Sequence, residues 1–358
     1  MNSQNMFAPV NLGRLTLRNR IVMAPMTRSR ADDNGIAADF AGAYYSQRAD
    51  AGLLITESTQ ISDEGKGYPR TPGIHAGDQV EAWRRIVDAV HARGAQFVMQ
   101  LNHVGRIASE LNRSSAAETV GPSAVQAAGE MYTDVKGMVE HDVPRALTAA
   151  DIAGIGQDFA LAAKNAIKAG FDGVEFHAAN GYLAHQFIAT NANQRSDDYG
   201  GSVPNRLRAP LVWLDSVTDA VGSDRVGVRI SPTHTFNDIE EADTEAVYGE
   251  FLTALSSRNL AYLHVIRPFA NTTNLDVIAF ARTNYSGNIV ANGGFNQVEG
   301  AAFIADGKAD AISFGSSFIA NPDLVSRFKS GVELAVPNEE TFYSPGREGY
   351  TDYPIAQT

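Results

Sequence analysis

The chain has 358 residues, of which 44% are hydrophobic and 20% are charged, a composition typical of a soluble globular protein. Its formal net charge of −12 argues against nucleic acid or an anionic membrane surface as a partner. The absence of cysteine excludes disulfides, iron–sulfur clusters, cysteine-ligated zinc and thiol nucleophiles.

At the N-terminus, residues 1–7 show no basic patch followed by an apolar stretch, and no long apolar run follows anywhere in the chain, so we expect a cytoplasmic enzyme without a membrane segment. Further along, short apolar stretches alternate with longer segments of helical period. Several are continuous apolar runs, which is typical of parallel strands buried on both faces. The predicted strands are residues 21–24, 53–57, 97–101, 173–177, 226–230, 262–266, 289–291 and 311–314.

Apolar residues at three- and four-residue spacing predict amphipathic helices between these strands. The first covers residues 78–93 and stops at Gly94; the next begins at a capping box, Thr148 to Asp151, and ends at Gly170. Residues 205–221 repeat the pattern, and residues 244–258 do so more weakly. Strand followed by helix, repeated to about eight, predicts a closed (β/α)8 TIM barrel. An open doubly wound sheet is the alternative, disfavoured because no Gly-x-Gly-x-x-Gly turn follows the first strand.

One long segment breaks this rhythm. Residues 106–147 separate the third strand from the next helix and have no sustained period. An insertion of this length is usually functional, and here it would lie over the C-terminal mouth of the barrel and help to shape a pocket. With no linker or internal repeat, we expect one domain over residues 1–358, with an N-terminal cap and this excursion after strand three.

Polar side chains gather where the fourth predicted strand ends, and strand ends carry the reactive groups of such barrels. The strand runs into His177, Asn180 and Tyr182. If a helix begins at residue 178, His177 and Asn180 project from one face, because residues three apart are neighbours on a helix. Two such donors suit one carbonyl or nitro oxygen that gains negative charge, and a nearby phenol can supply a proton. A core histidine beside a packing tyrosine is the alternative, disfavoured by the clustering of these residues with His185.

Glycines follow the seventh and eighth predicted strands. Loops at these two places bind a phosphate in many barrels, through backbone N–H groups that glycine lets approach closely. Gly293 and Gly294 after the seventh strand and Gly315 after the eighth together predict a cofactor phosphate site. The glycines at either strand end alone could belong to a plain turn. Gln100 and Arg229 end the third and fifth strands. A buried arginine there suits either a structural ion pair or an anionic reduced flavin, whose pyrimidine edge Gln100 could bind.

Together these residues resemble the Old Yellow Enzyme family of FMN-dependent ene-reductases. The similarity runs from Phe7-Ala-Pro-Val-Asn-Leu-Gly13 and Asn19-Arg-Ile-Val-Met-Ala-Pro-Met-Thr-Arg28 to Glu348-Gly-Tyr-Thr-Asp-Tyr353. Its most specific block is His177-Ala-Ala-Asn-Gly-Tyr-Leu-Ala-His-Gln-Phe187, followed by Asn193-Gln-Arg-Ser-Asp-Asp-Tyr-Gly-Gly201.

The resemblance implies roles for individual residues. His177 and Asn180 would hold the activating oxygen of the substrate, and Tyr182 would protonate the alkene. Tyr68, Asn102 and Tyr350 would border the substrate pocket. Thr27 would bond the flavin O4, and Pro25, Met26 and Ser58 would contact the ring. The residues implied to bind FMN are Pro25, Met26, Thr27, Ser58, Gln100, Arg229, Gly293, Gly294, Gly315 and Ser316.

The implied reaction has two halves that share one pocket. NADPH or NADH reduces bound FMN, and the flavin N5 then delivers a hydride to the β-carbon of an activated alkene (an enone, enal, maleimide or nitroalkene). Such kinetics are ping-pong. No metal, nucleic acid or membrane is expected to take part, and the chain is expected to be a monomer or homodimer.

Two positions depart from the family pattern. Relatives usually carry Phe-Gly-Arg-Pro-Phe at the eighth strand end, where the arginine grips the FMN phosphate; here the run is Phe314-Gly-Ser-Ser-Phe318. Ser316 carries no charge, so we predict weaker FMN retention unless another cation, such as Arg267, substitutes. Asn102 replaces a frequent tryptophan, which predicts a roomier or more polar pocket. Two other functions stay open: metal-dependent hydrolysis using His103, His177 and His185, and a non-catalytic ligand-binding relative.

Overall fold

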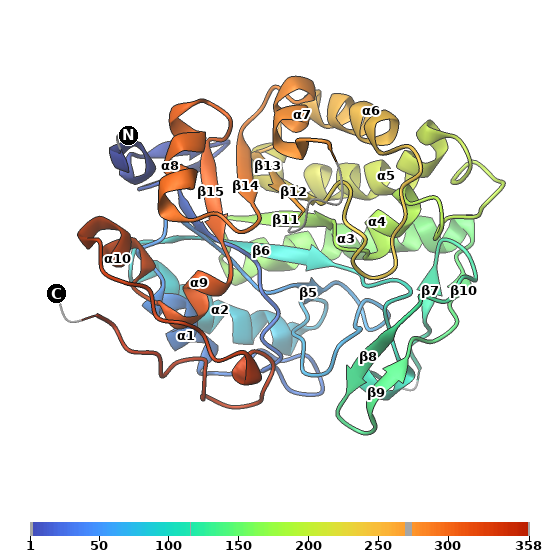
Figure 1. Cartoon of the computed structure of the whole chain (residues 1–358). Helices are drawn as coiled ribbons and strands as arrows, with labels where there is room; N and C mark the ends of the chain where they lie inside the picture. Colours follow the sequence, from blue (N-terminus) through green and yellow to red (C-terminus); the bar gives the residue numbers. More distant parts are fainter. Residues whose placement is uncertain (1–2, 115, 269–273, 357–358) are drawn as a thin grey trace.

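The computed structural model describes residues 3–114, 116–268 and 274–356. Eight parallel strands form a closed ring in which each strand pairs with the next along the chain and the last pairs with the first (Figure 1). The strands of the ring are β3 (Ile21–Met23), β4 (Leu53–Ile55), β6 (Gln96–Asn102), β11 (Gly173–Ala178), β12 (Val226–Ile230), β13 (Tyr262–Ile266), β14 (Ile289–Asn292) and β15 (Ala311–Phe314). The predicted (β/α)8 barrel and its strand positions are confirmed.

Helices cover the outside of the ring and bury their apolar stripes against it. The larger ones are α2 (Gly77–His91), α3 (Ala149–Ala169), α5 (Val203–Val221), α6 (Thr244–Ser256), α7 (Val277–Asn284) and α8 (Gln297–Ala305). The predicted capping box opens α3: the Asp151 N–H donates to Thr148 Oγ1, and the Thr148 N–H donates to Asp151 Oδ2. Gly170, with φ of 105°, ends α3 in the left-handed conformation that glycine adopts freely. Shorter helices are α1 (Ala41–Gln47), α4 (Leu183–Ile188), α9 (Ser316–Ala320) and α10 (Leu324–Ser330).

A small antiparallel hairpin closes the N-terminal end of the barrel. It consists of β1 (Val10–Leu12) and β2 (Leu15–Leu17) and follows the 3-10 helix η1 (Ser3–Phe7). The leucines of this hairpin pack with residues from the start of the barrel strands, including Val22, Leu53 and Val98. The predicted N-terminal cap is therefore present, and the opposite end of the barrel is left for ligands.

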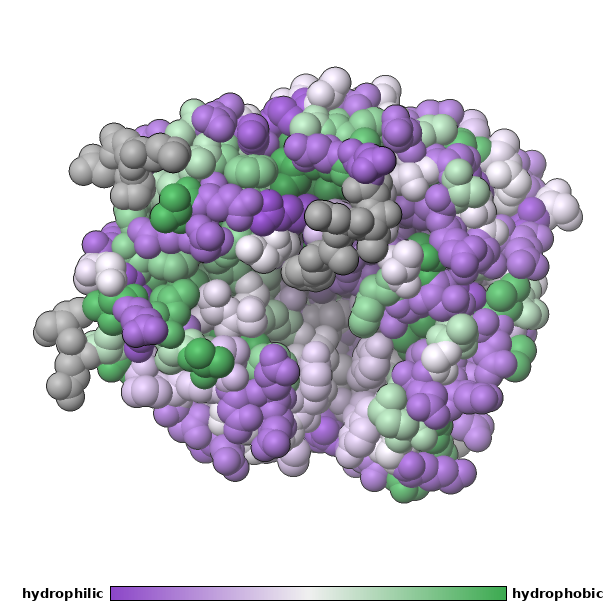
Figure 2. Space-filling model, viewed as in Figure 1, coloured by the Kyte–Doolittle hydropathy of each residue, from purple (hydrophilic) through white to green (hydrophobic). Residues whose placement is uncertain are grey.

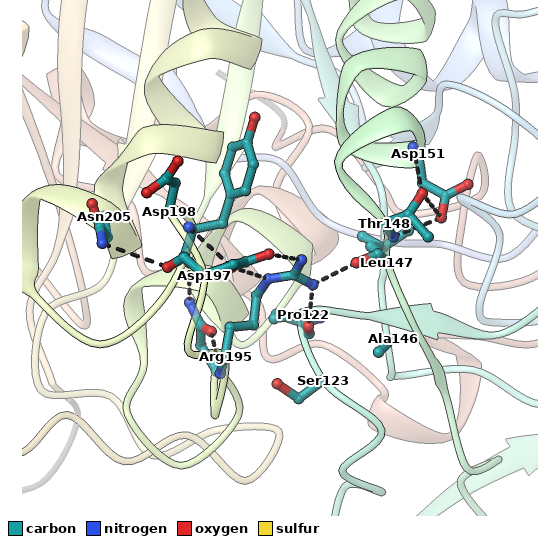
Figure 3. Close-up of polar contacts among 12 residues, drawn as sticks. Pro122, Ser123, Ala146, Leu147, Thr148, Asp151, Arg195, Asp197, Asp198 and Asn205 are labelled. Atoms are coloured by element: carbon teal, nitrogen blue, oxygen red, sulfur yellow. Dashed lines mark hydrogen bonds and ion pairs between the residues drawn. The ribbon is translucent and has the colours of Figure 1, made fainter.

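The segment between β6 and α3 forms a separate excursion beside the barrel mouth. It contains η2 (Glu110–Asn112), the parallel pair β7 (Val120–Gly121) and β10 (Arg145–Ala146), and an antiparallel hairpin of β8 (Glu130–Thr133) and β9 (Gly137–Glu140). Figure 3 shows what ties it down: Arg195, after α4, donates to the carbonyl oxygens of Pro122 and Leu147 and pairs with Asp197. The block 193–201 thus anchors the excursion.

Figure 2 shows that the face presented in Figure 1 is hollowed near its centre. Within the described residues, no helix combines the length and apolar character needed to cross a membrane.

Candidate active site

The C-terminal mouth of the barrel holds a cavity of about 330 Å³, which we call the inner cavity. Most of the predicted site residues meet there, although they come from six of the eight strand ends. Its lining includes Pro25, Met26, Thr27, Ser58, Gln100, His177, Asn180, Tyr182, Arg229, Gly315 and Ser316. A wider cavity of about 760 Å³, the outer cavity, shares Thr27, Tyr182, Phe236 and Tyr343 with it. A third, of about 240 Å³, continues from Arg229 and Gly315 towards Gly294 and Ser317; we call it the phosphate-end cavity.

The turn after β11 presents the central residues, but not by the helical geometry predicted from the sequence. Asn180 has a φ of 55°, in the left-handed region, and α4 begins only at Leu183. The Asn180 N–H donates to Ser231 Oγ at 2.8 Å, and its carbonyl accepts from Asn237 Nδ2 at 2.8 Å. The expectation of a helix from residue 178 is therefore wrong. Backbone hydrogen bonds to the loop after β12 hold this residue in a conformation that most side chains avoid.

His177 and Tyr182 lie edge to face, with ring centroids 5.2 Å apart. Burial, reinforced by Arg229, holds the pKa of His177 well below its ordinary value, so the imidazole is neutral at physiological pH. Burial also raises the pKa of Tyr182 well above its ordinary value, so the phenol keeps its proton. A neutral hydrogen-bonding imidazole thus lies next to a protonated phenol.

Residues beyond Arg229 in the loop after β12 also build the site, and sequence analysis missed them. Asn237 donates to the Asn180 carbonyl and lies close enough to the hydroxyls of Tyr68 and Tyr182 to influence the pKa of both phenols. Phe236 lines both the inner and the outer cavity, as does Tyr343 from the C-terminal segment. Phe236 and Asn237 follow the fifth predicted strand, and this position is the sequence signal that could identify them.

A second buried group holds the same turn from behind. The Gly181 N–H donates to His185 Nδ1 at 3.1 Å, and His185 Nε2 lies 2.6 Å from Glu241 Oε1. Tyr248 donates its hydroxyl proton to the same carboxylate at 2.8 Å. His185 therefore orients the turn after β11 rather than lining the inner cavity.

Gln100 and Arg229 are buried at the floor of the inner cavity, 1% and 6% exposed. Arg229 donates through one terminal nitrogen to Asn292 Oδ1 at 3.1 Å. Its Nε and the Nδ1 of His177 are buried and have no hydrogen-bond partner among the described residues. Buried polar atoms are nearly always paired, so these two indicate a ligand with complementary oxygen or nitrogen atoms. The residues present fit the polar edge of a flavin.

The phosphate-end cavity contains no arginine other than Arg229 among its lining residues. Gly294, Gly315, Ser316 and Ser317 line it. Gly293 does not: a Cβ there would lie 2.7 Å from the carbonyl oxygen of Arg267, so close backbone packing requires the glycine. Arg267 forms a bidentate ion pair with Glu299, at 2.6 and 2.9 Å, and donates to the Gly293 carbonyl. The suggestion that Arg267 replaces the missing phosphate arginine is therefore not supported.

Two residues expected at the substrate pocket, Tyr350 and Asn102, are not among the lining residues of the inner cavity. Tyr350 is fully buried and stacks on Tyr44 with ring centroids 3.9 Å apart, and it lines none of the three cavities. Asn102 borders, with Tyr68 and Tyr182, a crevice of about 10 Å³, which is room for about one water. Thr27, Ser58, Tyr68 and Tyr182 line this crevice as well as the larger cavities, so the prediction of a roomier or more polar pocket at Asn102 stays a prediction.

Comparisons with known proteins agree with this geometry. The NADH:flavin oxidoreductase / NADH oxidase family matches residues 5–335. The chain belongs to this family. A probable flavin mononucleotide-dependent alkene reductase from Leishmania infantum is 41% identical over 355 residues, covering 98% of this chain and 97% of the relative. The rice 12-oxophytodienoate reductase 1 is 41% identical over 361 residues, covering 98% and 93%.

Solved structures of family members superpose closely. Morphinone reductase, as an N189A mutant in complex with tetrahydroNAD, has a TM-score of 0.95 at 41% identity, covering 99% of this chain and 98% of that chain. An old yellow enzyme homologue from Zymomonas mobilis has a TM-score of 0.95 at 39% identity, covering 98% and 100%. The resemblance to the Old Yellow Enzymes is confirmed. Within the described residues, no group of three or more histidine or acidic side chains is placed to hold a metal ion, and family membership disfavours the hydrolase alternative.

Proposed function

We propose that the inner cavity reduces the C=C bond of activated alkenes, with His177 and Asn180 holding the activating oxygen and Tyr182 giving the proton. The chain is an FMN-dependent NAD(P)H oxidoreductase, as its family and its relatives indicate. The observation that carries the residue roles is that His177, Asn180, Tyr182, Gln100 and Arg229 all line one cavity.

Each role follows from the state in which the fold keeps the side chain. The neutral imidazole of His177 and the amide of Asn180 can donate hydrogen bonds to a carbonyl or nitro oxygen, and these bonds strengthen as negative charge develops on it. Tyr182 keeps its proton until the carbon next to that carbonyl or nitro group becomes basic. Tyr68, which shares the outer cavity with Tyr182, contributes to the high pKa of this phenol.

Bound FMN supplies the redox chemistry, taking a hydride from NAD(P)H and passing one to the β-carbon of the alkene. Gln100 and Arg229 would hold its pyrimidine edge, Thr27 its O4 side, and Gly294, Gly315, Ser316 and Ser317 its phosphate end. Pro25 and Met26 line both the inner and the phosphate-end cavities, where they would contact the ring. Nicotinamide and alkene would occupy the inner cavity in turn, which implies ping-pong kinetics.

An absorbance spectrum of the purified protein with added FMN, followed by turnover of 2-cyclohexenone with NADH and NADPH, tests this proposal. We expect flavin bands, bleaching by a reduced nicotinamide under anaerobic conditions, and recovery of the bands on adding the enone. His177→Ala should lose recovery by the enone but keep bleaching in part. Flavin occupancy that added FMN cannot raise would contradict the cofactor, and a bleached protein that no enone, maleimide or nitroalkene reoxidises would contradict the substrate class.

A further inference from the structure

A chain of hydrogen-bonded polar side chains is buried inside the barrel, directly behind the floor of the inner cavity. Glu175 on β11 is fully buried, and its Oε1 accepts a hydrogen bond from Gln100 Nε2 at 2.8 Å. Its Oε2 lies 2.9 Å from Nδ1 of His264 on β13, which is also fully buried. His264 Nε2 in turn lies 2.7 Å from Ser313 Oγ on β15. Neither Glu175 nor His264 lines the inner cavity, and neither has a role in the reaction proposed above.

The strand register explains why these side chains meet. Glu175 pairs with Gln100 across β11 and β6, and Arg229 pairs with His264 across β12 and β13. Inward-pointing residues of neighbouring strands stack in layers inside such barrels. Glu175 also pairs with Gly227, where a Cβ would come within 2.3 Å of the Tyr262 ring, so this layer is packed without spare room.

Hydrogen bonds from Gln100 and His264, with Arg229 nearby, favour the ionised form of Glu175. Burial alone would raise its pKa, but His264, Arg229 and the Gln100 hydrogen bond together bring the pKa below its usual value. An unpaired carboxylate in such a site would be costly, so each partner is needed. The side chain therefore contributes a negative charge behind Arg229, the cation of the inner cavity.

We propose that Glu175, held by His264, is a positioning residue for the flavin site that orients Gln100 and lowers the reduction potential of the bound flavin. This rests on the proposed function, since it concerns the same cofactor. An ionised carboxylate only accepts hydrogen bonds, so the amide nitrogen of Gln100 must face Glu175 and its oxygen is turned away from that carboxylate. Gln100 thus offers an acceptor to the donor N–H of a flavin pyrimidine.

The negative charge of Glu175 affects how readily the bound flavin accepts a hydride. NAD(P)H becomes NAD(P)⁺ by giving up two electrons and a proton as hydride, so one unit of negative charge arrives at the acceptor held by Arg229 and Gln100. Arg229 stabilises that charge, and the carboxylate behind it offsets part of this stabilisation. Removing the carboxylate charge should therefore make the flavin easier to reduce.

The test is the two-electron reduction potential, measured against a reference dye, for the wild type, Glu175→Gln and a matched control. The control is Glu241→Gln, which makes the same change in the other buried Glu–His pair, whose partners are the turn residues rather than Gln100 and Arg229. We expect Glu175→Gln to shift the equilibrium at least tenfold towards reduced flavin, about 30 mV. We expect the equilibrium constant for flavin reduction in Glu241→Gln to stay within threefold of the wild-type value. No shift, or an equal shift in both variants, overturns the proposal.

A conservative variant keeps the test decisive if Glu175→Gln does not fold. Glu175→Asp retains the charge but is one methylene too short to hold Gln100. We expect the equilibrium constant for flavin reduction in Glu175→Asp to stay within threefold of the wild-type value. Its dissociation constant for oxidised FMN should rise at least tenfold, and an unchanged dissociation constant contradicts the orienting role. A wild-type protein that binds no flavin would contradict the proposed function itself, whereas bound flavin with an unaltered potential in Glu175→Gln contradicts only this inference.

Discussion

The hydroxyl of Tyr182 is the proposed proton source, because it lines the inner cavity and burial keeps it protonated. Tyr182→Phe should slow reoxidation of reduced enzyme by 2-cyclohexenone by about 10²–10⁴-fold, the usual contribution of a positioned acid. Reduction by NAD(P)H, which needs no proton from Tyr182, should change little. Stopped-flow absorbance measures the two half-reactions separately. Tyr285→Phe is the control, a buried tyrosine directly after α7 that lines none of the three cavities; equal losses in both variants would argue against a proton-donor role.

Ser316 lies at the edge of the phosphate-end cavity, where Arg229 is the one charged lining residue within the described part of the chain. Ser316→Arg should tighten FMN binding by about 10- to 100-fold, because a hydrogen bond to a charged group is worth about 1.5–3 kcal/mol. Riboflavin, which lacks the phosphate, should bind both proteins equally. Fluorescence titration of apoprotein with each flavin measures the two affinities. A gain for riboflavin as large as that for FMN would show that position 316 does not face the phosphate.

At the scale of elements, Glu57 joins the end of β4 to the loop after β3, accepting the Arg28 N–H at 3.0 Å. Burial raises the pKa of Glu57 from 4.5 to about 7. The folded state therefore binds this proton more tightly than the unfolded state. The resulting stabilisation is full below about pH 4.5 and is lost as pH rises through about 7.

Glu57→Gln removes this titration while keeping the shape and an acceptor for the Arg28 N–H. Between pH 5 and pH 8 the wild type should lose about 2 kcal/mol of unfolding free energy relative to the variant. Urea denaturation at the two pH values measures the difference. Glu245→Gln, an exposed position in the first turn of α6, should show no such dependence. A difference in unfolding free energy between wild type and Glu57→Gln that is the same at both pH values would mean that Glu57 is charged across the range.

The strands and the main helices could be predicted because their apolar periods are local. The turn after β11 could not: Asn180 is left-handed because Ser231 and Asn237, more than fifty residues away, bond its backbone. Tyr350 was misplaced for the same kind of reason, since its stacking on Tyr44 depends on how the C-terminal segment crosses α1. The site residues at strand ends followed from barrel topology, whereas Phe236 and Tyr343 come from loops whose path no period predicts.

At the scale of the whole molecule, acidic residues outnumber basic ones and give a net charge of −12. This excess of acidic residues extends to the lining of the outer cavity. Its charged lining residues are Arg70, Asp134 and Glu340, and Arg70 already forms an ion pair with Asp134. NADPH differs from NADH by a phosphate that carries nearly two negative charges at neutral pH. Among the described residues, this lining has two acidic groups and no unengaged cation. It should repel that phosphate, so we expect a higher kcat/KM for NADH than for NADPH.

Glu340→Lys should narrow this preference by about tenfold, because it replaces a repelling charge with an attracting one at the cavity rim. Glu245→Lys changes the net charge equally on α6, away from the outer cavity, and should leave the ratio of the two kcat/KM values unchanged. Because exposed charges are screened by salt, the effect of Glu340→Lys should shrink as ionic strength rises from about 0.01 M to 1 M. Steady-state assays with both nicotinamides across this range measure it; a preference that responds equally to both variants would mean that overall charge, and not the outer cavity, selects the reductant.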